Sequence, residues 1–429
     1  MVAFRALARR VDGDRTATIS RVPRRRHRSL RKRWVLIGVG LFAFLLFWNT
    51  ANLRGDPLRP DYYVLADAFL HGRVWIEPTA LLPTSDRVDM DGRTFVHFGP
   101  LPAILLMPLV AVWGAAALAT REGIVNAALG GLSVALCWRL VDGHDSGRLA
   151  DRVWIVALFA LSTPLWWVVT LGGVWHTAQL VATCATLLAL LEATGRRRPW
   201  LLGLLAGAAF LARFPTVMAL PFYAWLAMQP RSLPHLGWPT TTEVRRGSLA
   251  IAGFVPAGLF TGWYNLVRFG SPLETGYRLV TACCPFFERE LAKGFFSLRH
   301  LGKNLDYLLW HVPKMGDGPL RPDGLGLSVF ITSPALLLAA KADWRDPMLR
   351  WAGLTAVAVL VPSLVYYGGG WYQLGFRYFL DSIPFLMLPV ASGARNGLGI
   401  GWKALIVFGA VVSAWGMYAF LHFPISVPE

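Results

Sequence analysis

A stretch near the start of the chain is unusually rich in carboxylates. Between residues 51 and 98 lie seven acidic side chains, Asp56, Asp61, Asp67, Glu77, Asp86, Asp89 and Asp91. A carboxylate can accept a proton from an attacking hydroxyl when its environment tunes its pKa. Each acid also has a structural interpretation: Asp61 follows Pro60 and could cap a helix, and Asp89 and Asp91 precede Gly92 and could shape a turn.

Three basic side chains stand beside apolar runs. His97 precedes Gly99 and Pro100 at the start of such a run, where it could bind a phosphate, shuttle a proton or simply be solvated. His176 follows Trp175 at the start of another. Arg213 interrupts two further runs, so it needs a charged partner or a route to the surface.

The third group lies late in the chain, between Gly368 and Asp381. Its glycines permit a tight turn, and Tyr372 is typical of a membrane interface. Arg377 and Asp381 are four residues apart at the predicted start of a helix, so they could form an ion pair. Alternatively, the Arg377 guanidinium could bind two oxygens of an anionic phosphate.

The elements that carry these residues are predicted to be membrane helices. The chain is 55% hydrophobic and only 16% charged, against roughly a quarter charged in soluble proteins. Continuous apolar runs of about twenty residues indicate spanning helices rather than barrel strands. Candidate spans lie near 34–50, 99–118, 122–140, 153–171, 174–193, 199–213, 214–229, 248–267, 325–340, 350–367, 377–393 and 402–421.

The charge distribution orients these spans. The net charge is +17, and twelve of the 42 Lys and Arg residues precede Trp34. Residues 1–33 therefore read as a basic cytoplasmic tail attracted to anionic lipids, and we expect no nucleic-acid partner. Basic connections near 196–198, 231–246 and 395–403 place the C-terminus outside, which an even number of spans would contradict. One candidate is therefore broken, re-entrant or misread as a span, with the proline-rich stretches at 100–108 and 164–173 as suspects.

Residues 34–429 are predicted to form a single transmembrane domain with two long outer loops, 51–98 and 268–324. Both loops contain amphipathic helical patterns. The first covers Asp61 to His71. In the second, apolar residues recur from Leu301 to Val312 opposite Lys303, Asn304 and Asp306, which indicates a helix lying in the membrane interface.

The sequence resembles the GT-C superfamily of polytopic membrane glycosyltransferases, in particular the bacterial protein mannosyltransferase and aminoarabinose transferase branch. The resemblance rests on four segments in order along the chain: Asp61 to Arg73, Phe95 to Pro102, Tyr264 to Tyr277, and Gly375 to Asp381 continuing to Pro384-Phe385. It implies an all-α bundle of about 11–12 transmembrane helices with interfacial helices in the outer loops.

The resemblance also implies an activity on the outer face of the cell membrane. A monosaccharide would pass from a polyprenyl-phosphate donor to a glycan, lipid or protein acceptor, with no cofactor and no required metal ion. The base would be an acid of the first outer loop: Asp61, then Asp56, then Asp86, although Tyr62 stands where the family carries a second acid. The expected substrate-binding residues are His97, His176, Arg213, Glu274, Tyr277, Tyr372, Arg377 and Asp381.

Two other functions fit the same pattern. A transporter or flippase for a lipid-linked envelope precursor would use the basic and aromatic interfacial residues without a catalytic acid. A non-catalytic envelope-assembly protein would turn over no prenyl-phosphate sugar. Substitution of the three candidate acids separates these functions from glycosyl transfer.

Overall fold

The computed structural model describes residues 24–53, 59–77, 86–143, 147–228, 239–280, 285–313, 320, 322–370 and 372–423, with side chains from Arg33 onward. Its α-helices are α1 (Arg24–Asn52), α2 (Asp61–Leu70), α3 (Leu101–Trp113), α4 (Ala115–Ala119), α5 (Glu122–Gly143), α6 (Leu149–Leu161), α7 (Pro164–Leu171), α8 (Val174–Thr194), α9 (Pro199–Ala212), α10 (Leu220–Met228), α11 (Thr241–Phe269), α12 (Pro285–Ala292), α13 (Leu301–Leu309), α14 (Val329–Thr332), α15 (Pro347–Leu364), α16 (Ile383–Gly393) and α17 (Ile400–His422). The 3-10 helices are η1 (Phe214–Ala219), η2 (Tyr277–Leu279), η3 (Leu298–His300), η4 (Pro334–Lys341) and η5 (Arg377–Asp381), and the strands are β1 (Val88–Met90) and β2 (Arg93–Phe95).

The predicted all-α membrane architecture is confirmed. Within the described residues, six helices are long and apolar enough to cross a bilayer: α1, α5, α8, α11, α15 and α17. A seventh span forms if α6 and α7, which meet at 48°, are taken together. The other apolar helices are shorter, and several follow a proline or contain one, which removes a backbone donor and interrupts the run.

Helix α8 lies in the interior of the bundle, and 83% of the residues in its most apolar stretch are buried. Its first turns bury polar side chains, including Thr177 and Gln179, among apolar neighbours. Buried polar groups of this kind need partners or a function. Helix α8 thus places buried polar groups in its first turns, at the end of the bundle where the two long loops lie.

Helices α1 and α5 pack antiparallel through small residues. A side chain at Gly131 would lie only 2.8 Å from the Gly40 carbonyl oxygen. At the other end of the pair, a side chain at Gly123 would approach the Ala51 side chain to 3.1 Å. The end of α1 therefore meets the start of α5, as small residues allow between close membrane helices.

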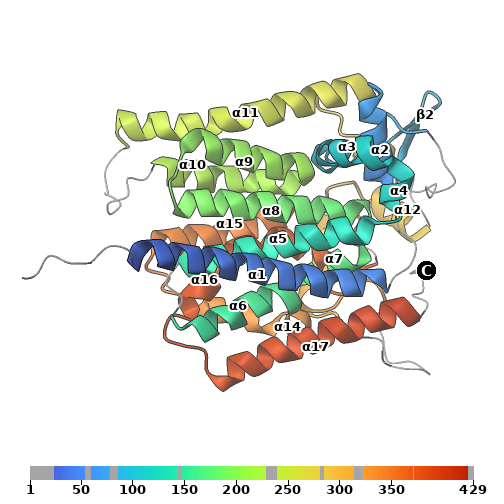
Figure 1. Ribbon diagram of the computed structural model, residues 1–429. Coiled ribbons are helices and arrows are strands. Elements are labelled where there is room, and N and C mark those ends of the chain that lie inside the picture. Colours follow the sequence, from blue (N-terminus) through green and yellow to red (C-terminus); the bar gives the residue numbers. More distant parts are fainter. Residues whose placement is uncertain are drawn as a thin grey trace, which may run out of the picture.

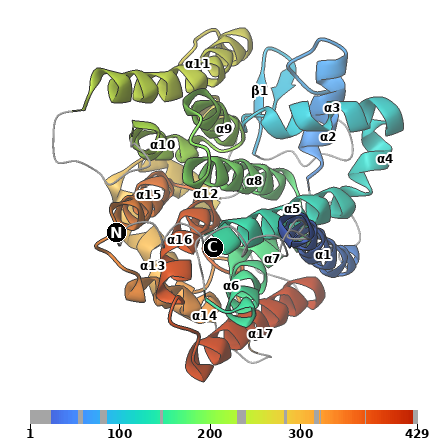
Figure 2. The ribbon, with the colours of Figure 1, turned by 60° about the vertical axis from the view of Figure 1, so that its left-hand side comes forward.

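This contact corrects the span predicted at 99–118. Since the end of α1 and the start of α5 are neighbours, the chain between them leaves and returns at the same end of the bundle. Helix α3 lies across the long helices, since it points toward the viewer in Figure 1 and lies across the view in Figure 2, where α1 is seen end-on. Thirteen residues span about 20 Å, which is short of a hydrocarbon core. The apolar run is broken at Gly114, whose positive φ separates α3 from α4.

The loop elements gather at one end of the bundle, at the right in Figure 1, which we call the loop end. It carries α2, α3, α4, the hairpin and α12, and α17 also ends there. The hairpin pairs Val88 with Phe95 through a turn at Asp91 and Gly92, both with positive φ. The predicted turn is thus found at Asp91, whereas Asp89 lies in β1.

The helix predicted in the second loop is confirmed as α13, but its buried face is different. Asn304 is fully buried together with Tyr307 and Leu308, whereas Val312 is exposed. The sequence assigned Asn304 to the polar face. Its amide instead binds backbone carbonyls at the end of α15, which makes burial of a polar side chain favourable.

Candidate active site

Asp61 is completely buried at the start of α2. Arg59 donates to both of its carboxylate oxygens, at 2.8 and 3.2 Å, and Arg87 Nε lies 3.6 Å away. The carboxylate does not cap α2. Burial alone would lower the pKa of Arg59, but the Asp61 carboxylate holds that pKa above its usual value. Asp61 thus fixes a buried guanidinium.

Asp86 is the more accessible carboxylate, with 27% of its side chain exposed. Trp175 Nε1 donates to Oδ2 at 2.7 Å, and His97 Nε2 lies 3.7 Å from Oδ1. Arg59 Nη1 lies 3.6 Å from the same carboxylate. Asp86 is therefore oriented by its neighbours while keeping one side open to solvent.

His97 is fully buried beside Asp86. Its ring packs edge-on against Tyr277, with the two centroids 4.5 Å apart. The preceding carbonyl, of Val96, accepts a hydrogen bond from Arg268 at 2.7 Å, which fixes this segment on α11. Burial lowers the pKa of His97 to about 4, and Asp86 opposes this shift only in part. The imidazole is therefore neutral near pH 7.

Trp175, in the first turn of α8, joins the early and late parts of the chain. The Arg59 guanidinium carbon lies 5.1 Å from the centroid of its ring, and that of Arg377 lies 5.3 Å from it. Both distances are within the range of cation–π attraction. We call Arg59, Asp61, Asp86, Trp175 and Arg377 the tryptophan cluster. It brings the acids of the first loop and the late arginine into one site.

Arg377 has an unusual environment within this cluster. Gln373 accepts a hydrogen bond from its backbone N–H at 3.0 Å, and Gln179 donates to its carbonyl oxygen at 2.8 Å. The guanidinium also lies 5.1 Å from the Tyr378 ring. Its Nε and Nη1 are buried, and neither has a hydrogen-bond partner within the described residues. Buried donors without an acceptor are costly unless a ligand supplies the missing acceptor.

The pair proposed between Arg377 and Asp381 is not the one that the structure forms. Asp381 accepts from Arg213 Nη2 at 2.7 Å and from Nε at 3.1 Å. Residues 377–381 form a 3-10 helix, whose three residues per turn move positions four apart onto different faces. The Arg213 guanidinium lies 5.1 Å from the ring of Tyr378, beside the tryptophan cluster.

Comparisons with known proteins give one solved structure to report. The chain matches the crystal structure of ArnT from Cupriavidus metallidurans in the apo state, at 16% identity and a TM-score of 0.47. The match covers 91% of this chain but 65% of that one. No family model matches the sequence, and no curated protein matches it. A likeness of this size does not assign a function, so the proposal below rests on the site.

Four further predicted site residues have the following places. Tyr277 packs on His97 and on Phe214 and is part of the site. His176 is buried one residue after Trp175, with Nδ1 at the Gly172 carbonyl. Glu274 accepts from the N–H of Gly276 at 2.9 Å, in the turn before Tyr277. Tyr372 packs against Trp167 of α7 and Phe420 of α17.

Asp56, the second candidate base, lies outside the described residues.

The sequence also leads us to expect no bound metal ion. Within the described ranges, no group of three or more His, Cys, Asp and Glu side chains is placed to hold an ion. The absence of a required metal remains a prediction.

Sequence reasoning missed several residues of the site. Arg59 and Arg87 each stand within two positions of a candidate acid, and an adjacent opposite charge is a signal of pairing that was available. Trp175 was noted only as the neighbour of His176. Gln179 and Gln373 carried no signal, because an isolated glutamine in an apolar run has no recognisable pattern.

Proposed function

We propose that this protein transfers a monosaccharide from a polyprenyl-phosphate donor to an acceptor at the loop end, which faces the outside of the cell membrane. The N-terminal tail is cytoplasmic in this proposal. One observation carries it: the Trp175 indole donates to Asp86 while Arg59 and Arg377 lie over its ring. A carboxylate that can accept a proton therefore lies beside guanidiniums that can bind a phosphate.

Asp86 is the base in this mechanism. Both oxygens of Asp61 are held by Arg59, so that carboxylate has no access to an acceptor hydroxyl. Asp86 keeps an exposed side and is oriented by the Trp175 N–H. The acceptor oxygen forms a bond to the anomeric carbon, the bond from that carbon to the phosphate oxygen breaks, and Asp86 takes the hydroxyl proton. The electron pair of the broken bond leaves on the lipid phosphate.

Arg377 binds the departing phosphate. Its Nε and Nη1 are buried donors without a partner within the described chain, so two phosphate oxygens would satisfy both. Charge that grows on the leaving oxygen is stabilised most where donors are fixed beforehand and water is excluded. Neutral His97, beside Asp86, supplies a hydrogen-bond donor to the bound donor lipid rather than a positive charge, since its ring nitrogens have no hydrogen-bond partner within the described residues.

The decisive experiment uses the purified full-length protein and a panel of radiolabelled polyprenyl-phosphate sugars. Breakdown of one donor, with transfer of label to an acceptor present in membrane extract, supports the enzyme. The Asp86→Asn variant should bind the donor and fail to transfer the sugar. A transporter would instead move the intact lipid across a vesicle in both proteins. No breakdown of any donor by the wild type would overturn the proposal.

A further inference from the structure

The backbone of Arg377 is held by side chains rather than by a regular helix. Arg377 stands at the start of η5, after a loop that leaves the end of α15 at Leu364. Gln373 and Gln179 bind its N–H and its carbonyl oxygen, respectively. Both glutamines are fully buried. The direction in which the guanidinium points therefore depends on two neutral side chains.

Gln373 makes most of these connections. Its backbone N–H donates to Gly324 at 3.0 Å, and its Nε2 donates to the carbonyls of Leu325 at 2.7 Å and Gly369 at 3.0 Å. Its Oε1 accepts from Arg377 N–H at 3.0 Å. One side chain thus binds three backbone groups, one of which belongs to Arg377.

Two glycines make room for this amide. A side chain at Gly370 would come within 2.3 Å of Gln373 Oε1, and one at Gly326 within 3.3 Å of Nε2. Both glycines have positive φ, at 80° and 128°, where other residues are strained. The backbone on both sides of Gln373 is therefore adapted to its side chain.

We propose that Gln373 is a positioning residue that directs the Arg377 guanidinium toward the phosphate of the lipid-linked donor. This inference rests on the proposed function, because it assigns the phosphate to Arg377. Without the Gln373 amide, the N–H of Arg377 loses its acceptor and the start of η5 is free to turn. The guanidinium then no longer faces the ligand from its place over the ring of Trp175.

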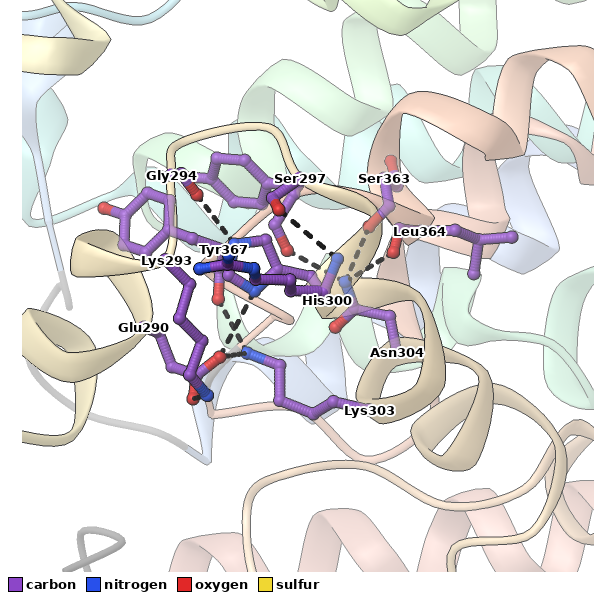
Figure 3. Close-up of polar contacts among 12 residues, drawn as sticks. Glu290, Lys293, Gly294, Ser297, His300, Lys303, Asn304, Ser363, Leu364 and Tyr367 are labelled. Atoms are coloured by element: carbon purple, nitrogen blue, oxygen red, sulfur yellow. Dashed lines mark hydrogen bonds and ion pairs between the residues drawn. The ribbon is translucent and has the colours of Figure 1, made fainter.

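Asn304 provides a matched control at the other end of the same loop (Figure 3). Its Nδ2 donates to the carbonyls of Ser363, Leu364 and Tyr366 at 3.3, 2.9 and 2.8 Å. It is fully buried, as Gln373 is, and its side chain likewise binds three backbone groups. None of those groups belongs to Arg377. A purely structural role would make the two residues equivalent.

The experiment measures binding of a polyprenyl phosphate, and of the polyprenol of equal chain length, to the full-length protein in nanodiscs. Gln373→Met should weaken binding of the phosphate about tenfold, as expected when Arg377 loses one buried hydrogen bond to the phosphate, and leave binding of the alcohol unchanged. In an Arg377→Ala background the same change should add less than about twofold, because coupled residues are not additive. Asn304→Leu should lower the melting temperature without changing the preference for phosphate.

The outcomes are distinguishable. Equal losses for both lipids, or additive losses in the double variant, would overturn the positioning role while leaving the proposed function intact. A wild type that binds phosphate and alcohol equally would overturn the proposed function and this inference with it. If Gln373→Met does not fold, Gln373→Glu is the second variant: it keeps an oxygen that accepts from the Arg377 N–H and loses the donor to Leu325 and Gly369. It should retain the preference for phosphate, and loss of that preference would overturn the positioning role.

Discussion

Two polar clusters lie at the loop end, and they differ in how completely their charges are satisfied. In the lysine cluster (Glu290, Lys293, His300 and Lys303; Figure 3), one carboxylate receives bonds at 2.6 and 2.7 Å from the two lysines. His300 Nδ1 lies 3.3 Å from the same group. In the tryptophan cluster, Arg377 has two buried nitrogens without hydrogen-bond partners within the described residues.

The difference separates a structural cluster from one that binds a ligand. Both lysines of this cluster bind the Glu290 carboxylate, and Lys303 also donates to the Tyr367 carbonyl at 2.8 Å, so the cluster joins α12 and α13 to the loop after α15. A buried charge without a full set of partners persists when another function requires it. We therefore expect substitutions in the tryptophan cluster to change activity and those in the lysine cluster to change stability.

The largest effect should follow from Asp86→Asn. The amide keeps the size of the side chain but cannot accept the proton, so the rate of sugar transfer should fall by about 10²–10⁴-fold. The rate is measured with labelled donor at saturating concentration. Glu290→Gln is the matched change in the lysine cluster and should retain the rate. If the Asp86→Asn variant kept more than about a tenth of the normal rate of sugar transfer, Asp86 would not be the base.

A smaller effect should appear as a pH dependence of stability. Because the pKa of His97 is lowered from 6.5 to about 4 in the folded protein, the unfolded chain binds more protons between those values. Stability therefore falls as the pH is lowered through this window, by about 2 kcal/mol at pH 5. Melting temperatures at pH 7 and pH 5 measure the change. His97→Gln should lose less stability between these two pH values than the wild type does.

Removing the acid of the lysine cluster should cost stability alone. Partial burial opposes the charge of Glu290, but hydrogen bonds from Lys293 and Lys303 lower its pKa to about 2. Its contribution is present above the ordinary pKa of 4.5 and is lost as the pH falls toward 2. At pH 7, Glu290→Ala should destabilise the protein by about 1 kcal/mol, since water screens the lysines. If the variant instead lost its phosphate binding, the distinction between the clusters would fail.

The smallest effect should come from an exposed ion pair in the first loop, between α1 and α3. Glu77 pairs with Arg73, and 72% of the Glu77 side chain is exposed. Exposed pairs contribute little, so Glu77→Gln should change stability by less than about 0.5 kcal/mol. Sugar transfer should be unaffected in the same assay. A larger loss of stability or of sugar transfer would show that solvent exposure does not distinguish functional charges from those that contribute little.

Local patterns in the sequence predicted much of the fold. The long apolar runs predicted α5, α8 and α17, and the periodicity after Pro60 predicted α2. Sequence patterns failed where a tertiary contact decides how a segment lies or whether a side chain is buried. The apolar run at 99–118 has the composition of a span but lies across the bundle, and Asn304 is buried because carbonyls of α15 face it.

The candidate site was predicted in part. Asp86, His97 and Arg377 were chosen by residue type and position, and the structure brings them to one place. Their connection through Trp175 could not be predicted, because it depends on contacts between residues about ninety and two hundred positions apart. The partner of Asp381 was missed because the sequence indicated an α-helix and the structure has a 3-10 turn.

The contact between Ala51 and Gly123 has a consequence for engineering. Because these two residues are neighbours, the segment between the end of α1 and the start of α5 begins and ends at one place, as an inserted domain does. Such a unit can be exchanged between related chains with two junctions a few ångströms apart, provided that the new segment keeps the contacts with Trp175 of α8 and Arg268 of α11. A chimera that kept this bundle and received the intervening 70 or so residues from another protein would transplant the carboxylates as one piece.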